Sequence, residues 1–134
     1  MSDFVLDASI AAAWLFDDES APSANSLLKR LREWEAVVPQ HWHLEVRNAL
    51  IVGERRGRIR PDEVDERLID LGTLPVRTDL EPDFDAALRL SRFHRLSFYD
   101  AVYLELARRQ GLPLATLDAD LGAAAVVEGV GRAE

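Results

Sequence analysis

Short runs of apolar residues recur along the chain and are separated by longer stretches in which apolar residues follow helical spacing. The runs do not alternate with polar residues, which is typical of strands covered on both faces in a parallel sheet. Five strands are predicted, at Phe4-Val5-Leu6, Ala36-Val37-Val38, Leu74-Pro75-Val76, Leu114-Ala115-Thr116 and Ala125-Val126-Val127. One helical stripe between them consists of Trp42, Val46, Ala49 and Leu50. Residues 101–107 are apolar nearly all round and predict a buried central helix.

Proline and glycine punctuate this pattern. Pro39, Pro61 and Pro82 stand where helices are predicted to begin, and Gly57 and Gly111 stand where helices are predicted to end. Strands that alternate with helices predict right-handed crossovers and an open α/β sheet. We therefore predict an α/β fold with a mostly parallel central sheet of four to five strands, in one domain spanning residues 1–134.

The composition narrows the classes of function. The chain has no cysteine, which removes disulfides, thiolate zinc sites and cysteine nucleophiles. No stretch approaches the ~20 apolar residues of a membrane span. The start, Met1-Ser2-Asp3, lacks the basic and apolar regions of a signal peptide, so we expect a soluble cytoplasmic protein. A formal net charge of −8 argues against a protein that binds nucleic acid through a net positive charge.

Arginines are clustered at one place on this acidic chain. Arg55, Arg56, Arg58 and Arg60 fall within six positions. They can be solvated cations near a helix C-terminus, where positive charge is favourable. They can alternatively form a local patch that contacts the phosphates of RNA or a protein partner. The sequence favours the first interpretation and leaves the second open.

Four acidic residues lie far apart in the chain, each in apolar sequence where a strand ends or a helix begins or turns inward: Asp7, Glu45, Asp100 and Asp118. Apolar neighbours predict that these carboxylates are drawn inward, where an unpaired charge costs on the order of several kcal/mol. Sites in open α/β sheets form beyond the carboxyl ends of strands, at a switch point in strand order. Asp7 ends the first predicted strand and Asp118 follows the fourth, so they meet if those strands are neighbours.

Each acid also has a purely structural explanation. Asp7 and Asp118 can be helix N-caps, and Asp100 has the spacing of a capping box. Glu45 can pair with an arginine such as Arg47 or Arg56. For one residue alone we prefer the structural explanation, whereas the four together favour a site.

Four converging carboxylates would repel one another and raise their own pKa values unless a cation compensates. His41 and His43 are two positions apart and cannot chelate as an i, i+4 pair would, and we expect all three histidines at the surface or at helix ends. Oxygen ligands alone select Mg²⁺ or Mn²⁺ over zinc. Such ions activate water, and two of them ~3.5–4 Å apart would hold the attacking and leaving oxygens of a phosphodiester displacement.

Polar residues near the acids add to this hypothesis. Asn48 lies three positions after Glu45 on the same helix flank, where an amide suits the surroundings of an ion site. Ser9 and Thr116 are each two positions from one of the aspartates. Their hydroxyls can contact a metal-bound water or phosphate, or can equally satisfy backbone groups.

Four segments carry a family resemblance: Val5-Leu6-Asp7-Ala8-Ser9, Glu45-Val46-Arg47-Asn48-Ala49-Leu50, Leu96-Ser97-Phe98-Tyr99-Asp100-Ala101 and Thr116-Leu117-Asp118-Ala119-Asp120-Leu121. Each motif alone is weak. In this order and at this chain length they are specific. The chain resembles the PIN-domain ribonucleases, and most closely the VapC-type toxins of bacterial toxin–antitoxin pairs.

The resemblance implies a three-layer α/β/α sandwich in which the first and fourth strands are adjacent. It also implies an endoribonuclease that hydrolyses RNA by water activated by Mg²⁺ or Mn²⁺, a homodimer, and inhibition by the tail of a VapB-type antitoxin. By position, Asp7, Asp100 and Asp118 would hold the metal. Glu45 would orient or help deprotonate the metal-bound water. The supporting residues would be Ser9, Asn48 and Thr116, with Asp120 as an optional further acid.

Other classes of function remain open. A receiver-type phosphoacceptor domain also gathers acids around Mg²⁺, but it needs adjacent acids after the first strand and a lysine after a late one. Here Ala8 and Ser9 follow Asp7, and the only lysine, Lys29, lies early in the chain. A phosphohydrolase with an Asp-x-Asp motif fails because Ser9 stands at the second acid. A catalytically idle PIN-like binding module is a further alternative.

Overall fold

The computed structural model describes residues 3–16 and 22–133, so Met1 and Ser2 of the expected leaderless start lie outside the described residues. The strands are β1 (Phe4–Leu6), β2 (Ala36–Pro39), β3 (Val76–Asp79) and β4 (Leu114–Ala115). The helices are α1 (Ala8–Leu15), α2 (Pro22–Arg30), α3 (Gln40–Arg55), α4 (Pro61–Gly72), α5 (Phe84–His94), α6 (Phe98–Gln110) and α7 (Ala119–Val127). None of these helices has the length and apolar character needed to cross a membrane.

The sheet is parallel and has the strand order β3-β2-β1-β4. The first and fourth strands are therefore neighbours, and Leu6 pairs with Ala115 in their register. The pairing continues one residue further, because the Asp7 N–H donates to the Ala115 carbonyl at 3.0 Å. The chain adds β2 and β3 on one side of β1 and later adds β4 on the other. The edge between β1 and β4 is therefore the switch point at which open α/β sheets form sites.

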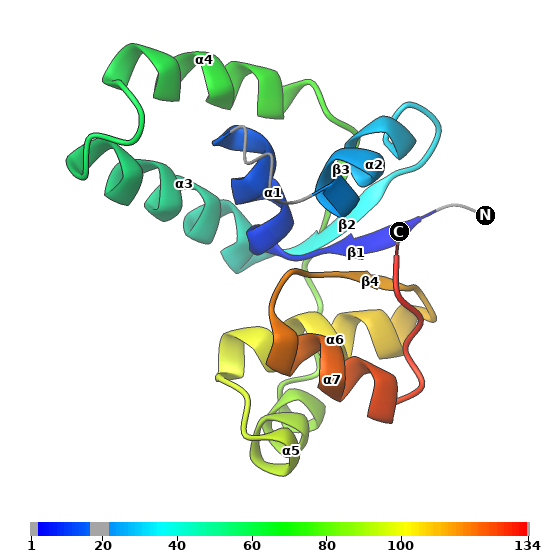
Figure 1. The fold of residues 1–134 in the computed structure, drawn as a ribbon. Helices are drawn as coiled ribbons and strands as arrows, with labels where there is room; N and C mark the ends of the chain where they lie inside the picture. Colours follow the sequence, from blue (N-terminus) through cyan, green and yellow to red (C-terminus); the bar gives the residue numbers. More distant parts are fainter. Residues whose placement is uncertain (1–2, 17–21, 134) are drawn as a thin grey trace.

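Helices cover both faces of this sheet. Figure 1 shows α1, α3 and α4 on one side and α5, α6 and α7 on the other. Every residue of β1 and β2 is buried, as expected for strands that carry apolar side chains toward both helical layers. The predicted α/β/α sandwich with a parallel sheet is confirmed, and the described residues supply four strands.

Two strand predictions were wrong in detail. The run Ala125-Val126-Val127 ends helix α7 instead of forming a strand. A short apolar run does not distinguish a strand from a helix. Here Val126 and Val127 are 75% and 67% exposed, so no second layer covers them.

The third strand begins at Val76, later than predicted, because Pro75 has no N–H to give to the ladder. The Pro75 carbonyl still accepts the Ala36 N–H at 2.9 Å.

Helix α6 is the buried central helix that the sequence predicted. All residues from Ala101 to Ala107 are buried, and the helix contacts β1, β2 and β4 as well as α5 and α7. Ser97 begins the helix by accepting the Asp100 N–H at 3.1 Å. Gly111 ends it in the left-handed conformation at φ 66°, as its predicted position after the helix requires. The first turn of α6 is thus fixed in place by its packing and by its cap.

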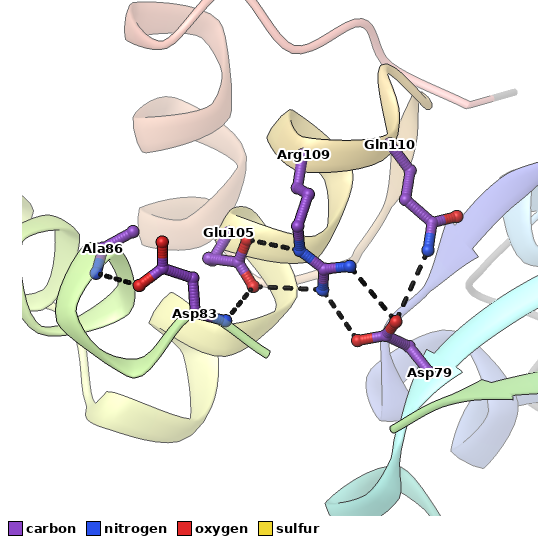
Figure 2. A network of polar contacts seen from close by, with 6 residues as sticks. All are labelled: Asp79, Asp83, Ala86, Glu105, Arg109 and Gln110. Carbon is purple, nitrogen blue, oxygen red and sulfur yellow. Dashed lines mark hydrogen bonds and ion pairs between the residues drawn. The ribbon is translucent and has the colours of Figure 1, made fainter. Parts of the chain in front are cut away.

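A network of charged residues anchors α6 to its neighbours. Glu105 is only 4% exposed, and Arg109 donates to both of its carboxylate oxygens, at 2.8 and 3.1 Å. The same guanidinium donates to both oxygens of Asp79 at the end of β3 (Figure 2). The N–H of Asp83, the N-cap of α5, completes the set by donating to Glu105 at 3.1 Å. The buried charge is therefore fully compensated, which such a group requires.

Candidate functional site

Asp7 is the most buried of the four predicted acids. It follows β1 directly and is 5% exposed. Thr116 Oγ1 and Ser9 Oγ both donate to its Oδ2, at 2.6 and 2.8 Å. Burial raises the pKa of Asp7, and these two hydrogen bonds partly oppose the rise. Asp7 stands at the N-cap position of α1, as its structural explanation predicted, but its side chain makes no capping hydrogen bond to that helix.

The hydroxyls of Ser9 and Thr116 bridge the two strand ends. Ser9 Oγ also accepts the Leu117 N–H, and Thr116 Oγ1 also accepts the Asp118 N–H, both at 3.0 Å. The alternative in which these hydroxyls satisfy backbone groups is therefore confirmed. Each hydroxyl has a single proton to donate, and in both residues that proton goes to Asp7. The pair fixes the orientation of the Asp7 carboxylate.

Asp118 begins α7 and behaves as a helix cap. Its Oδ1 accepts the Leu121 N–H at 2.9 Å, as its structural explanation predicted. It is exposed, so the expectation that all four acids are drawn inward was wrong here. Its charge nevertheless raises the pKa of Asp100. Asp120 is exposed in the first turn of α7, and within the described part of the chain no contact joins it to the other acids.

Asp100 lies half-buried in the first turn of α6. Burial raises the pKa of its carboxyl group. The charges of Asp7, Asp118 and Glu45 raise that pKa further, in this order of effect. Asp100 is thus the residue at which the charges of all four acids meet. Its backbone N–H takes part in the cap at the same time.

Glu45, on α3, is held by residues that the sequence pattern did not single out. The Tyr103 hydroxyl donates to Oε1 at 2.7 Å, and His41 Nε2 lies 3.3 Å from the same oxygen. Burial raises the pKa of Glu45, the hydrogen bond from Tyr103 lowers it, and the charge of Asp7 raises it. Arg47 is not its partner, because that guanidinium donates to a backbone carbonyl of its own helix.

The ring of His41 packs against two tyrosine rings next to Glu45. Its ring packs edge-on against Tyr103, with 4.9 Å between centroids, and lies 5.4 Å from the ring of Tyr99. Its Nε2 is 3.1 Å from the Tyr99 carbonyl oxygen. Burial lowers the pKa of His41, and the nearby carboxylates partly oppose this. The one usable signal in the sequence was the i, i+4 spacing of His41 and Glu45.

The sequence placed the histidines at the surface or at helix ends, and two of them fit the second description. His41 and His94 do lie near helix ends, but their side chains are 15% and 8% exposed and do not belong to the surface. His94 Nε2 lies 2.6 Å from Glu128 Oε2, on the side of the molecule formed by α5 to α7. A carboxylate partner distant in sequence explains this burial.

The clustered arginines divide into two kinds. Arg60 is the N-cap residue of α4 and pairs with Asp62 at 3.2 Å and with Glu63 at 3.5 Å, all at the surface. Arg60 is thus solvated, as the favoured interpretation predicted, but it begins a helix, and only Arg55 stands at the predicted helix C-terminus. Arg55, at the end of α3, is exposed. Arg56 and Arg58 lie apart from that surface pair, on the lining of a cavity.

This cavity lies between α1 and α3 and has a volume of about 440 Å³. Ser9 and Asn48 line it together with Arg56 and Arg58. Because Ser9 is hydrogen-bonded to Asp7, the cavity and the acids share one wall. The structure therefore brings Asn48 to the edge of the acid site, on the side of the arginines.

The donor set fits a hard divalent cation. All donors are oxygens, and the pKa values of Asp7, Glu45 and Asp100 are all raised, which a bound cation would reverse. Within residues 3–16 and 22–133, no three His, Cys, Asp or Glu side chains are grouped to chelate one ion. A site without three grouped ligands is compatible with Mg²⁺, because Mg²⁺ typically binds through one or two carboxylates and keeps several waters.

Known proteins are similar to this chain in sequence and in fold. The PIN domain family matches residues 4–127. Ribonuclease VapC3 of Pyrobaculum aerophilum is 33% identical over 121 residues, which cover 87% of this chain and 90% of that protein. The crystal structure of PAE2754 from the same organism has a TM-score of 0.73 at 24% identity, covering 92% of this chain and 84% of that one.

Two further structures have the same fold. Mycobacterium tuberculosis VapC20, a sarcin-ricin loop cleaving toxin, has a TM-score of 0.62 at 18% identity, covering 90% of this chain and 94% of that one. A toxin–antitoxin complex from Klebsiella pneumoniae has a TM-score of 0.59 at 19% identity, covering 86% of each chain. The family match over most of the chain and the similarity to a VapC ribonuclease show that this chain belongs to the PIN-domain family, in its VapC branch.

Proposed function

We propose that this protein is a metal-dependent endoribonuclease, the toxin of a toxin–antitoxin pair, and that residues 1–134 act as a single nuclease domain. One observation carries the proposal. The carboxylates of Asp7, Glu45, Asp100 and Asp118 come from four separate elements and are electrostatically coupled at the switch point of the sheet. Similarity to a ribonuclease of the VapC branch supports the choice of RNA as substrate.

Asp7 and Asp100 would be the main ligands of Mg²⁺ or Mn²⁺, and Asp118 would complete the site. A bound ion of this kind supplies positive charge at the scissile phosphate and lowers the pKa of a coordinated water. Ser9 and Thr116 keep the Asp7 carboxylate in one orientation through their hydrogen bonds to its Oδ2. This preorganisation is useful because the ligand does not have to be reoriented during the reaction.

Glu45 would accept the proton of the attacking water. Its raised pKa suits this role, because a base is most effective when its pKa lies near the working pH. Tyr103 and His41 both contact Oε1, so Oε2 remains available to take the proton. Tyr103 therefore acts as a positioning residue, and the burial of its ring keeps its hydroxyl in place.

We also propose two protein partners, an antitoxin and a second copy of this chain. The solved toxin–antitoxin complex of the same fold supports an inhibitory VapB-type antitoxin. A homodimer is supported by apolar side chains around α5 and the start of α6, where Leu80, Phe84 and Tyr99 are 65%, 62% and 63% exposed. Sedimentation equilibrium would contradict the dimer if it gave the mass of one chain. RNA and antitoxin would both be met in the cytoplasm.

Removal of the metal or of an acid should abolish cleavage. We expect a structured RNA pool to be cut with Mg²⁺ or Mn²⁺ and left intact in chelator. Asp7→Asn and Asp100→Asn should lower the cleavage rate on the order of 100-fold or more, since even residues outside the ligand shell cost up to that much. Asp120→Asn is the matched control and should cleave normally. Activity that persists in chelator would contradict the mechanism, and no activity in any condition would favour an idle binding module.

Tyr103→Phe should slow catalysis without weakening substrate binding. The substitution removes the hydroxyl bond to Glu45 and keeps the buried ring. A hydrogen bond to a charged group contributes about 1.5 kcal/mol or more, so we expect kcat to fall roughly tenfold with KM unchanged. Tyr99→Phe, at an exposed tyrosine of the same helix, serves as the control. An equal loss in both variants would argue against positioning.

The metal-free protein should gain stability when Asp100 is neutralised. A carboxyl group whose pKa is raised on folding favours the native state below its ordinary pKa of 3.8 and loses that contribution as the pH rises through the raised value. In chelator, we therefore expect Asp100→Asn to melt at or above the wild-type temperature, with a difference that grows as the pH rises above 3.8. Added Mg²⁺ should stabilise the wild type more than the variant. Marked destabilisation in chelator would support a purely capping role.

A further inference from the structure

The cavity between α1 and α3 is built like a small-ligand site that the acids do not fill. Its volume of about 440 Å³ falls within the roughly 300–1,000 Å³ of such sites. About half of its lining is apolar, with Ala12 and Ala13 from α1 and Ala49 and Val52 from α3. The polar groups gather at its ends, where they can orient a ligand.

Phe16 packs closely against α3 at the far wall of the cavity. Gly53 of α3 lets the Phe16 ring approach so closely that a Cβ at this position would lie 2.5 Å from two ring carbons. The Arg58 guanidinium then lies over the same ring, 4.2 Å from its centroid. One face of the guanidinium is thus covered by Phe16. A flat guanidinium supported in this way is a surface on which nucleobases stack.

The two arginines of the cavity carry charge that the described residues leave unneutralised. Arg60 pairs with neighbouring carboxylates, whereas neither Arg56 nor Arg58 forms an ion pair with any residue of the described ranges. Acidic residues outnumber basic ones, 24 to 16, so carboxylates are not scarce in this chain. Two cations that have no carboxylate partner among residues 3–16 and 22–133, and that lie beside a cavity, are consistent with an anionic ligand.

We propose that this cavity binds the nucleotide adjacent to the scissile phosphate of the RNA, with its base between α1 and α3 and its phosphate at Arg56. The inference rests on the proposed nuclease function and adds a base-recognition subsite to it. The base would stack on Arg58, and the Asn48 amide, which offers both donors and an acceptor, would contact its edge. Cleavage would therefore depend on the base at this one position.

The position of the cavity favours RNA over a peptide. Ser9 lines the cavity and donates to Asp7, so a strand whose phosphate lies at the acids enters the cavity with its next nucleotide. An acidic peptide would also bring negative charge to the arginines, but its acidic side chains offer no flat, uncharged ring to the apolar part of the lining or to the Arg58 guanidinium. An RNA strand brings an uncharged base to the apolar part of the lining and a phosphate to the arginines.

The test uses a short oligoribonucleotide that contains a mapped cleavage site, and copies with one abasic residue at each flanking position. For the wild type we expect kcat/KM to fall on the order of tenfold or more at one flanking position only, because a stacked base is lost there. Ala49→Leu fills the cavity and should cleave the intact and abasic oligonucleotides equally. Ala123→Leu, at an exposed alanine of α7, should retain the wild-type preference.

A second pair of variants tests the phosphate contact without altering the core. In an inactive Asp7→Asn background, Arg56→Ala should weaken binding of the labelled oligonucleotide and reduce the slope of log affinity against log salt by about 0.7, the value for one phosphate on a single strand. Arg55→Ala, at an exposed arginine that does not line the cavity, should leave that slope unchanged.

The outcomes separate the subsite from the enzyme. If the wild type cleaves no RNA with either metal, the proposed function fails and the subsite fails with it. If it cleaves but every abasic oligonucleotide matches the intact one, or Ala49→Leu keeps the preference, the nuclease stands and the subsite is wrong. If Ala49→Leu loses only its inhibition by an antitoxin, the cavity belongs to the protein partner and the RNA assignment is overturned.

Discussion

The parallel pairing of β1 with β4 is the constraint on which the site depends. These strands have only three and two residues, yet they bring together segments that are 109 positions apart in the chain. Two hydroxyls extend the pairing beyond the backbone ladder, since Thr116 donates across to the Asp7 carboxylate and Ser9 accepts the backbone N–H of Leu117 from the opposite segment. Loss of this register would separate Asp7 from Asp118 and would also open the wall shared with the cavity.

The same arrangement links folding to ion binding. Asp7, Glu45 and Asp100 sit where burial and mutual repulsion disfavour their charged forms. The core must therefore hold in place a group of charges that opposes folding when no cation is present. Helix α6 holds these charges in place, because it is buried over seven consecutive residues and its only buried charge is neutralised by Arg109. A cation that binds only the native state would return the stability that the acids remove.

The sequence predicted most strands and helices correctly, but it predicted few of the contacts between side chains. The runs at β1, β2 and β4 and the apolar stretch of α6 were found because burial on all sides leaves a local signature. Residues 125–127 carry the same signature but end a helix, since local composition does not say which layer covers a segment. Tyr103 and His41 were missed for a related reason. The contact of Tyr103 with Glu45 spans 58 positions, and the sequence near either residue does not predict it.

The network at Arg109 has an evolutionary consequence. One guanidinium serves two carboxylates with paired hydrogen bonds, Asp79 from β3 and Glu105 from α6. A lysine offers a single point of charge and lacks this fork, so it cannot replace the arginine in both contacts. Loss of Arg109 alone would leave a buried carboxylate without a partner. In related sequences these three positions should therefore co-vary, conserved together or exchanged together for uncharged residues.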